Sequence, residues 1–201
     1  VETRGALMQA AVPEGKGAMA AIIGLESDRV IKCCREAQKD DEVTAANFNA
    51  PGQVVIAGSS EGVFRAMSLC KDAGAKRVVV LPVSAPFHTA MMYPAALGLK
   101  KYMESLNFFK PNIPIIHNVN ARLESDPERI RTLMLDQIHK PVLWVDCIEQ
   151  LLALGVDTLV ECGPGTVLSA LSKRINKNIK SFSLGQMDDF RLAMSTLSQG
   201  E

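Results

Sequence analysis

Residues 43–57 read VTAANFNAPGQVVIA and indicate two strands joined by a tight turn. The strands are expected at 43–49 and 54–57, where the residues form an apolar run on either side of a turn signal. Pro51 presets the φ of the second turn position, and Gly52 accepts the positive φ that the third position of a type II turn requires. We therefore expect a β-hairpin here.

The segments around this hairpin alternate between strand and helix. The expected order is a strand at 17–25, a helix capped by Ser27, the hairpin, a helix at 61–73 and a strand at 76–83. The last strand is nearly all apolar, which favours burial on both faces. Two strand–helix–strand units within about seventy residues are typical of a ferredoxin-like small subdomain, which we place at 14–83.

Helices dominate the rest of the chain, and we assign residues 1–13 and 84–201 to a second, larger subdomain. Strands that alternate with helices favour a parallel sheet covered by helices. Three strands alone would leave an exposed sheet edge, so we expect further strands from an N-terminal segment that precedes Val1. The elements expected in this subdomain are helices at 1–12, 90–106, 142–154, 167–175 and 187–197, and strands at 113–121, 158–162 and 179–184.

One more helix has two possible starts. Ser125 and Glu128 together fit a capping box, whereas Asp126 can cap a helix whose first residue is Pro127. Either start gives a helix that ends near His139, and the sequence leaves the choice open.

The composition is that of a globular protein, with 201 residues of which 47% are hydrophobic and 22% charged, and this excludes disordered and low-complexity classes. Basic and acidic residues number 22 each, and without a basic run we expect no nucleic-acid partner. The longest apolar stretches, such as 78–83, are too short to span a bilayer, so we expect no membrane association. Five cysteines without a C-x-x-C pair favour reduced thiols, a cytoplasmic location and no metal site.

His88 is the histidine whose position suggests chemistry. It follows the strand expected at 76–83 and precedes a helix, and loops at the carboxyl ends of strands often carry functional residues in α/β proteins. A histidine at such a place can act as a general base, but it can also be a core or capping residue. His117 and His139 fit structural roles.

Three other motifs have a functional and a structural interpretation. Residues 58–62, GSSEG, satisfy the G-x-S-x-G pattern of a nucleophile elbow with Ser60 as the nucleophile, yet they also fit a plain turn capped by Ser59 or Ser60. Residues 162–166, CGPGT, can hold an anion on backbone N–H groups or make a tight turn. Arg4 can bind a carboxylate or remain solvated.

Short segments spread over nearly the whole chain carry a resemblance. They are VETRGALMQ (1–9), KGAM (16–19), NFNAPGQVVIAG (47–58), LPVSAPFH (81–88), NV (118–119), Gln137, PVLW (141–144) and ECGPG (161–165). In this order they resemble the malonyl-CoA:acyl carrier protein transacylase family. Each segment is weak alone, but the ordered set is specific.

The resemblance implies an α/β fold with an α/β-hydrolase-like parallel sheet core, incomplete in this chain, and the ferredoxin-like small subdomain. It also implies a ping-pong transfer for fatty acid biosynthesis. A serine takes the malonyl group from malonyl-CoA, and the phosphopantetheine thiol of acyl carrier protein then receives it. The protein itself would need no cofactor.

The same resemblance implies roles for individual residues. His88 matches the catalytic base, and Gln137 matches the residue whose backbone carbonyl orients that base. The residues implied to bind or flank the substrate are Arg4, as the clamp on the malonyl carboxylate, with Met8, Asn49, Phe87 and Val167 around the pocket.

The sequence departs from the family pattern in two ways. The G-H-S-x-G elbow with its nucleophilic serine is not found, and residues 58–62 align with the small subdomain, so we expect the nucleophile in the segment that precedes Val1. Phe87 stands where many stand-alone bacterial enzymes have serine, which leaves the choice among acyl groups open. Two alternatives remain: a serine hydrolase that uses Ser60 and His88, and a non-catalytic module that binds the carrier protein.

Overall fold

A computed structural model describes residues 1–83 and 85–198. The chain forms two compact units, Val1–Cys147 and Ile148–Glu201. Ser84, with which the predicted remainder of the large subdomain begins, lies outside the described residues, as do 199–201. Helices and strands alternate along both units, so the fold is α/β.

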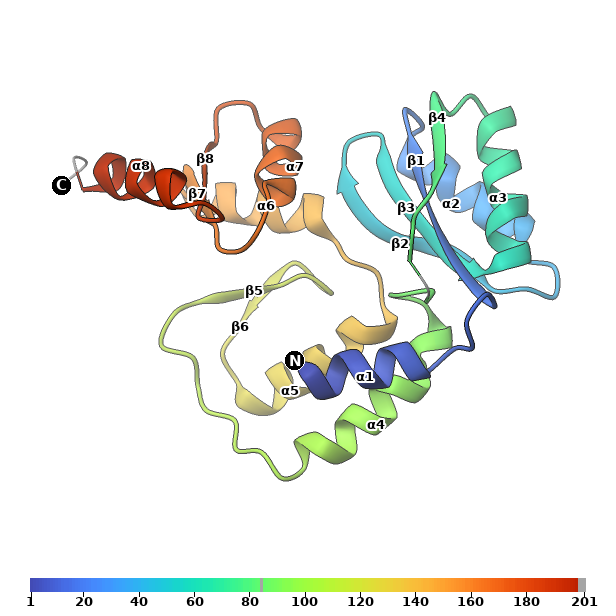
Figure 1. Ribbon diagram of the computed structural model, residues 1–201, viewed down its shortest axis with the longest axis horizontal. Helices are drawn as coiled ribbons and strands as arrows, with labels where there is room; N and C mark the ends of the chain where they lie inside the picture. Colours follow the sequence, from blue (N-terminus) through green and yellow to red (C-terminus); the bar gives the residue numbers. More distant parts are fainter. Residues whose placement is uncertain (84, 199–201) are drawn as a thin grey trace. The chain divides into compact units, whose positions relative to one another are not determined.

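A four-stranded antiparallel sheet organises the first part of unit 1, with strand order β2-β3-β1-β4. Helices α2 and α3 lie side by side against one face of it (Figure 1). The hairpin turn pairs Ala50 with Gln53, and Gly52 has a φ of 68°, as the sequence predicted. The elements are β1 Gly17–Ile23, α2 Ser27–Ala37, β2 Val43–Ala50, β3 Gln53–Ser59, α3 Ser60–Asp72 and β4 Arg77–Val80.

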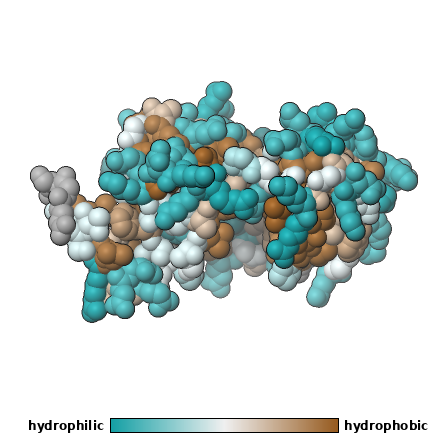
Figure 2. All heavy atoms as spheres, turned by 90° about the horizontal axis from the view of Figure 1, so that it is seen from above, coloured by the Kyte–Doolittle hydropathy of each residue, from teal (hydrophilic) through white to brown (hydrophobic). Residues whose placement is uncertain are grey.

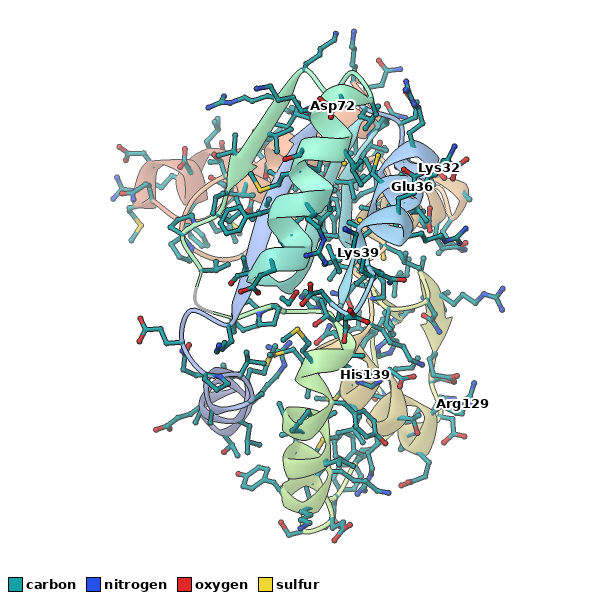
Figure 3. All side chains as sticks on the ribbon, turned by 90° about the vertical axis from the view of Figure 1, so that its right-hand side faces the viewer. Lys32, Glu36, Lys39, Asp72, Arg129 and His139 are labelled. Atoms are coloured by element: carbon teal, nitrogen blue, oxygen red, sulfur yellow. The ribbon has the colours of Figure 1, made fainter. Side chains whose placement is uncertain are left out.

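Both faces of the central strands are buried. Ile22 and Ile56 pack toward α2 and α3 in the main core. On the opposite face, Met19 and Val55 belong to a second cluster against which Phe87 packs. Polar residues of α2, such as Lys32 and Glu36, point away from the sheet (Figure 3). The second face therefore brings the segment after β4 onto the sheet.

Two local predictions for this part are wrong. The strand expected to be buried on both faces is the edge strand β4, which among the described strands pairs with β1 alone and leaves Val80 45% exposed. An apolar run does not reveal which strand lies at an edge. Ser27 does not cap α2 but is its first residue, and Glu26 holds the N-cap position without a side-chain hydrogen bond.

Helices form the second part of unit 1. Helix α1 (Glu2–Ala10) packs on α4 (Tyr93–Met103), where Gly98 leaves no room for a Cβ beside the Leu7 side chain. The short 3-10 helix η1 (Ala90–Met92) precedes α4, and α5 (Pro127–His139) packs against α4. The helix expected at 90–106 is thus two elements. His139, the last residue of α5, is labelled in Figure 3, and its ring contacts Tyr93 of α4 edge-on.

The start of α5 settles the choice that the sequence left open. Asp126 is the N-cap, because its Oδ1 accepts a hydrogen bond of 2.9 Å from the N–H of Glu128. Pro127 is the first helical residue, and the Ser125 capping box does not form.

The strand expected at 113–121 is wrong in extent and in partner. The chain instead makes an antiparallel hairpin of β5 (Ile115–His117) and β6 (Arg122–Glu124). Ala121 has a φ of 53°, and its N–H bonds to the carbonyl of His117 over 2.8 Å, which reverses the chain. A left-handed alanine carries no sequence signal, because this conformation is disfavoured for residues with a Cβ.

Unit 2 is built on a parallel strand pair. Strands β7 (Thr158–Glu161) and β8 (Lys180–Ser183) pair in parallel, and α7 (Val167–Ile175) connects them. Helix α8 (Met187–Leu197) follows β8, and α6 (Trp144–Ala153) contains the junction of the units. Parallel pairing was predicted, and so were the bounds of α7 and α8.

Hydrophobic residues reach the surface among hydrophilic ones (Figure 2). The most exposed large hydrophobic side chains include Phe109 and Ile113. Within residues 1–83 and 85–198, no helix combines the length and the apolar character needed to cross a membrane.

Candidate active site

His88 lies on the segment between β4 and η1, and its backbone is left-handed with a φ of 63°. Its ring Nδ1 lies 2.8 Å from the backbone carbonyl oxygen of Gln137. A carbonyl can only accept a hydrogen bond, so Nδ1 carries the proton and Nε2 presents its lone pair. This is the tautomer that a general base needs.

The Gln137 carbonyl is available because of its place in α5. The last carbonyls of a helix have no intrahelical partner, and residue 137 lies in the last turn of this helix. The negative end of the helix dipole also favours a positive charge at that point. His88 therefore meets an acceptor that holds its ring and stabilises the imidazolium formed when the base takes a proton.

The pKa of His88 lies below its ordinary value of 6.5. Burial is the main cause, and the nearby charge of Arg4 lowers the pKa further, against the opposing effect of hydrogen bonds to the backbone of Gln137 and Lys140. A lowered pKa keeps the imidazole neutral near pH 7, which leaves Nε2 free to accept a proton.

Arg4 projects from α1 and is partly buried, and burial lowers its pKa. A guanidinium nevertheless stays charged at any working pH. Its Nε is buried and has no hydrogen-bond partner among the described residues. A buried donor on a charged group without a partner is costly, so this nitrogen is suited to an anionic ligand.

A pocket of about 560 Å³ brings these groups together. Arg4 and Met8 enter it from α1, Met19 from β1, and Phe87 and His88 from the segment after β4. The residues that line it are Arg4, Gly5, Met8, Gln9, Met19, Asn47, Leu81, Val83, Phe87 and His88. A positive charge and a neutral base thus share a mainly apolar pocket within unit 1.

Residues 1–190 match the acyl transferase domain family. The chain belongs to this family. It is 46% identical over 190 residues to the malonyl CoA-acyl carrier protein transacylase of Haemophilus influenzae, an alignment that covers 94% of this chain and 61% of that protein.

Solved structures agree with this assignment. An acyl carrier protein S-malonyltransferase from Vibrio cholerae matches with a TM-score of 0.94 and 48% identity, covering 96% of this chain and 63% of that one. A malonyl-transacylase in complex with a type II PKS acyl-carrier protein matches with a TM-score of 0.95 and 42% identity, covering 97% of this chain and 63% of that one. The acyl transferase domain described here spans about three fifths of the length of its relatives.

The predicted site residues of the acyl transferase domain are partly brought together. The pocket contains Arg4, Met8, Phe87 and His88, and Gln137 reaches it through its hydrogen bond to His88. Asn49 is not among the lining residues. Val167 is the first residue of α7 in unit 2 and is 67% exposed.

Sequence reasoning missed Asn47, which lines the pocket. The pairing of β2 with β3 shifts register between Ala45 and Asn47 and again between Phe48 and Ala50. Such irregularities change which residues share a face, and simple alternation cannot locate them. The only sequence signal was that Asn47 belongs to the segment NFNAPGQVVIAG.

A polar network fixes the end of α5. The side-chain amide of Gln137 donates to Asn118 Oδ1 over 2.8 Å, and the Asn118 carbonyl accepts from Leu143 N–H over 2.7 Å. Val142 pairs with β2, since its N–H bonds to Ala46 O and its carbonyl to Phe48 N–H. The acceptor of His88 is therefore tied to the sheet that forms the pocket.

The G-x-S-x-G motif has a structural explanation. Ser59 is the N-cap of α3, with its Oγ accepting from Gly62 N–H over 3.0 Å. Ser60 Oγ donates to the Gly15 carbonyl over 2.8 Å and is not among the pocket residues. A Cβ at Gly58 would overlap the Glu42 carbonyl oxygen and lie 2.6 Å from Val43 Cα. Close packing, rather than an elbow, accounts for Gly58.

At the CGPGT turn before α7, a carboxylate of the chain itself occupies the place that an anionic ligand would take. Glu161 accepts hydrogen bonds from the N–H groups of Leu168 and Ser169 at the start of α7. Burial acts to raise the pKa of Glu161, but these hydrogen bonds outweigh it, so the pKa is lowered. Gly163 and Gly165 have φ values of 151° and 86°, which supports the tight-turn interpretation.

Two of the buried cysteines are poor nucleophiles. Burial raises the pKa of the Cys34 thiol to about 12 and that of the Cys147 thiol to about 11, so both stay protonated at neutral pH. In the described part of the chain, no group of three or more His, Cys, Asp or Glu side chains is placed to hold a metal ion.

Proposed function

We propose that the full-length protein transfers the malonyl group of malonyl-CoA to the phosphopantetheine thiol of an acyl carrier protein, as a step of fatty acid biosynthesis. The observation that carries the proposal is one pocket holding both His88, with its Nδ1 on the Gln137 carbonyl, and Arg4, whose buried Nε has no partner among the described residues. The activity named for the relatives from Haemophilus influenzae and Vibrio cholerae supports the choice of malonyl and carrier protein.

The reaction is a transfer in two halves through a malonyl-serine ester. In the first half, His88 Nε2 takes the proton of the serine hydroxyl as it attacks the thioester carbonyl, and the proton then passes to the departing CoA thiolate. In the second half, the phosphopantetheine thiol attacks the ester, His88 again carries the proton, and serine is regenerated. No electrons are gained or lost, and the protein needs no cofactor of its own for this chemistry.

The serine comes, in this proposal, from outside the 201 residues. The described lining of the pocket contains neither serine, threonine nor cysteine, and Ser60 is engaged elsewhere. We propose a segment that precedes Val1 as the source of the nucleophile and of the donors that stabilise the oxyanion. In this proposal the 201 residues have two protein partners, namely this preceding segment of the same enzyme and acyl carrier protein.

Arg4 binds the malonyl carboxylate. An anion that enters an apolar pocket loses hydration, and without a charged partner this loss is prohibitive. The planar guanidinium offers parallel N–H donors that match the two carboxylate oxygens. Met8 lies one turn further along α1 in the same pocket and provides an apolar wall beside the charge.

The finer architecture is also part of the proposal. We assign residues 14–83 to a ferredoxin-like subdomain, supported by the strand order β2-β3-β1-β4 and by two helices on one face. Residues 1–13 and 84–201 then belong to an α/β-hydrolase-like subdomain, of which β7 and β8 are two parallel strands. A cytoplasmic location stays a prediction from the cysteines.

Intact-mass spectrometry of the full-length protein tests the proposed function. After incubation with malonyl-CoA, we expect one malonyl adduct, located by peptide mapping on a serine outside these 201 residues, that holo acyl carrier protein removes. The 201-residue chain alone should acquire none. A stable adduct on Ser60 would support the hydrolase alternative, and binding of carrier protein without any adduct would support the non-catalytic one.

A further inference from the structure

The backbone of His88 needs to be held in place. Its φ of 63° lies in the left-handed region, which side chains with a Cβ adopt only when the surroundings impose it. Because the ring reaches the Gln137 carbonyl from this backbone conformation, relaxation of the loop would move Nδ1 away from its acceptor. The groups that restrain the residues around His88 are therefore candidates for a role in the reaction.

Part of the restraint comes from within the loop and from β1. Thr89 is fully buried, and its Oγ1 donates to the Pro86 carbonyl over 2.8 Å. Gly17, the first residue of β1, lies so close to Pro86 that a Cβ there would overlap the proline ring. These contacts fix Pro86 before His88 and tie it to Thr89 directly after His88, and a third contact holds the next part of the segment.

The side after His88 is held by Glu42. Its Oε1 accepts a hydrogen bond of 2.7 Å from the backbone N–H of Ala90, the first residue of η1 and two residues after His88. A carboxylate at this place meets N–H groups that have no partner inside the helix, and a charged acceptor makes such a bond stronger than a neutral one.

Glu42 itself is fixed at its backbone. Its carbonyl accepts from the N–H of Ser59 over 2.7 Å, and the next residue begins β2. Gly58 and Gly62 allow this close approach, because a Cβ at Gly62 would lie 3.0 Å from the Glu42 carbonyl oxygen and one at Gly58 would overlap it. The carboxylate therefore extends from a rigid point of the sheet to the loop that carries His88.

We propose that Glu42 is a positioning residue for His88: its carboxylate holds Ala90 so that His88 keeps its left-handed backbone and its Nδ1–H on the Gln137 carbonyl. The consequence for transfer rests on the proposed function, whereas the effect on the histidine ring does not. Sequence gives no hint of this role, since an acidic residue before a strand is usually a solvated charge.

Nuclear magnetic resonance of the histidine rings tests the proposal in the full-length protein labelled with ¹⁵N-histidine. In wild type, we expect His88 to be mainly the Nδ1–H tautomer above its pKa. Glu42→Gln keeps an oxygen acceptor and should preserve this state, whereas Glu42→Ala should raise the Nε2–H tautomer at least about threefold, because the Gln137 bond no longer selects Nδ1–H. An unchanged tautomer ratio in Glu42→Ala would overturn the proposal.

Two further variants guard against trivial effects. Glu42→Asp keeps the charge but is one methylene shorter, so it should behave like Glu42→Ala and serves if that variant does not fold. Glu124→Ala is the matched control, because Glu124 also accepts backbone N–H groups at a turn, those of Ser125 and Asp126. It should leave the His88 signals unchanged, and a change equal to that in Glu42→Ala would make the effect nonspecific and refute the proposal.

Kinetics of malonyl transfer give the second readout. Glu42→Ala should lower kcat at least about tenfold, which corresponds to about 1.4 kcal/mol, with KM for malonyl-CoA within about twofold. Glu42→Gln should recover most of the loss. If the tautomer changes while kcat does not, positioning by Glu42 is irrelevant to transfer; if wild type transfers no malonyl, the proposed function fails instead.

Discussion

Replacement of Arg4 by alanine should change which acyl group the full-length protein prefers. Malonyl differs from acetyl by one carboxylate, and Arg4 carries a buried Nε that has no protein partner among the described residues. In Arg4→Ala the malonyl carboxylate would enter the pocket without a counter-charge. The acetyl group has no carboxylate, so its transfer should change little in Arg4→Ala. The variant also removes a positive charge that an acetyl group leaves unpaired in the pocket.

The size of the effect follows from two charge-assisted hydrogen bonds. Each is worth about 1.5–3 kcal/mol, and because Arg4 is only partly buried, solvent screening favours the lower end, about 3 kcal/mol for the pair. This predicts a fall of about 150-fold in kcat/KM for malonyl-CoA. For acetyl-CoA the change should stay within about threefold in either direction.

The assay compares kcat/KM for the two acyl-CoA substrates in wild type, Arg4→Ala and Arg4→Lys. The lysine variant keeps the charge but not the planar fork, so its loss on malonyl-CoA should be intermediate. Since the Arg4 charge also lowers the pKa of His88, the pH profile of Arg4→Ala should move to higher pH. An equal loss with both substrates would show that Arg4 is structural and refute the selectivity argument.

Three other predictions concern the scaffold. Ser60→Ala in the full-length protein should keep malonyl transfer within about threefold, because Ser59, not Ser60, caps α3; a loss as large as that of His88→Ala would restore Ser60 as nucleophile. Gly17→Ala should destabilise the chain by about 1–3 kcal/mol in urea unfolding, because its Cβ would overlap the Pro86 ring. Gly5→Ala, where a Cβ meets nothing within 4 Å, should not destabilise it. Equal stability of both variants would contradict the packing argument. The pKa values of His88 and His117 both lie below 6.5 in the folded chain, so the unfolded chain binds more protons just below that pH. The free energy of unfolding should therefore rise with pH toward about 6.5. A flat stability profile that His88→Gln does not alter would contradict the pKa shift.

Local signals explain why the sheet of unit 1 could be predicted. Pro51 and Gly52 fix a turn by their own backbone preferences, and apolar periodicity marks α7 and α8 without reference to the rest of the chain. The β5–β6 hairpin escaped prediction because Ala121 is left-handed without being glycine. The edge position of β4 depends on strand pairing, which no local pattern encodes.

The candidate site shows the same division. Arg4 and His88 could be named because their residue types suit an anion and a base. The resemblance to a family, which rests on the order of short segments along the chain, then implied their roles. Glu42 and Asn47 could not, because one acts through a backbone N–H that is distant in sequence and the other depends on a register shift in β2. Contacts of these kinds arise only when distant segments pack together.

The rate of malonyl-adduct formation, followed by rapid-quench mass spectrometry against pH, tests most directly whether His88 is the base in the Arg4 pocket. In the full-length wild-type protein, the rate should rise with pH through an apparent pKa below 6.5 and then level off, as expected for a buried histidine held on the Gln137 carbonyl. His88→Ala should be slower by at least about a hundredfold and should lose that inflection. An adduct that forms in His88→Ala at the wild-type rate and with the same pH dependence would contradict the account.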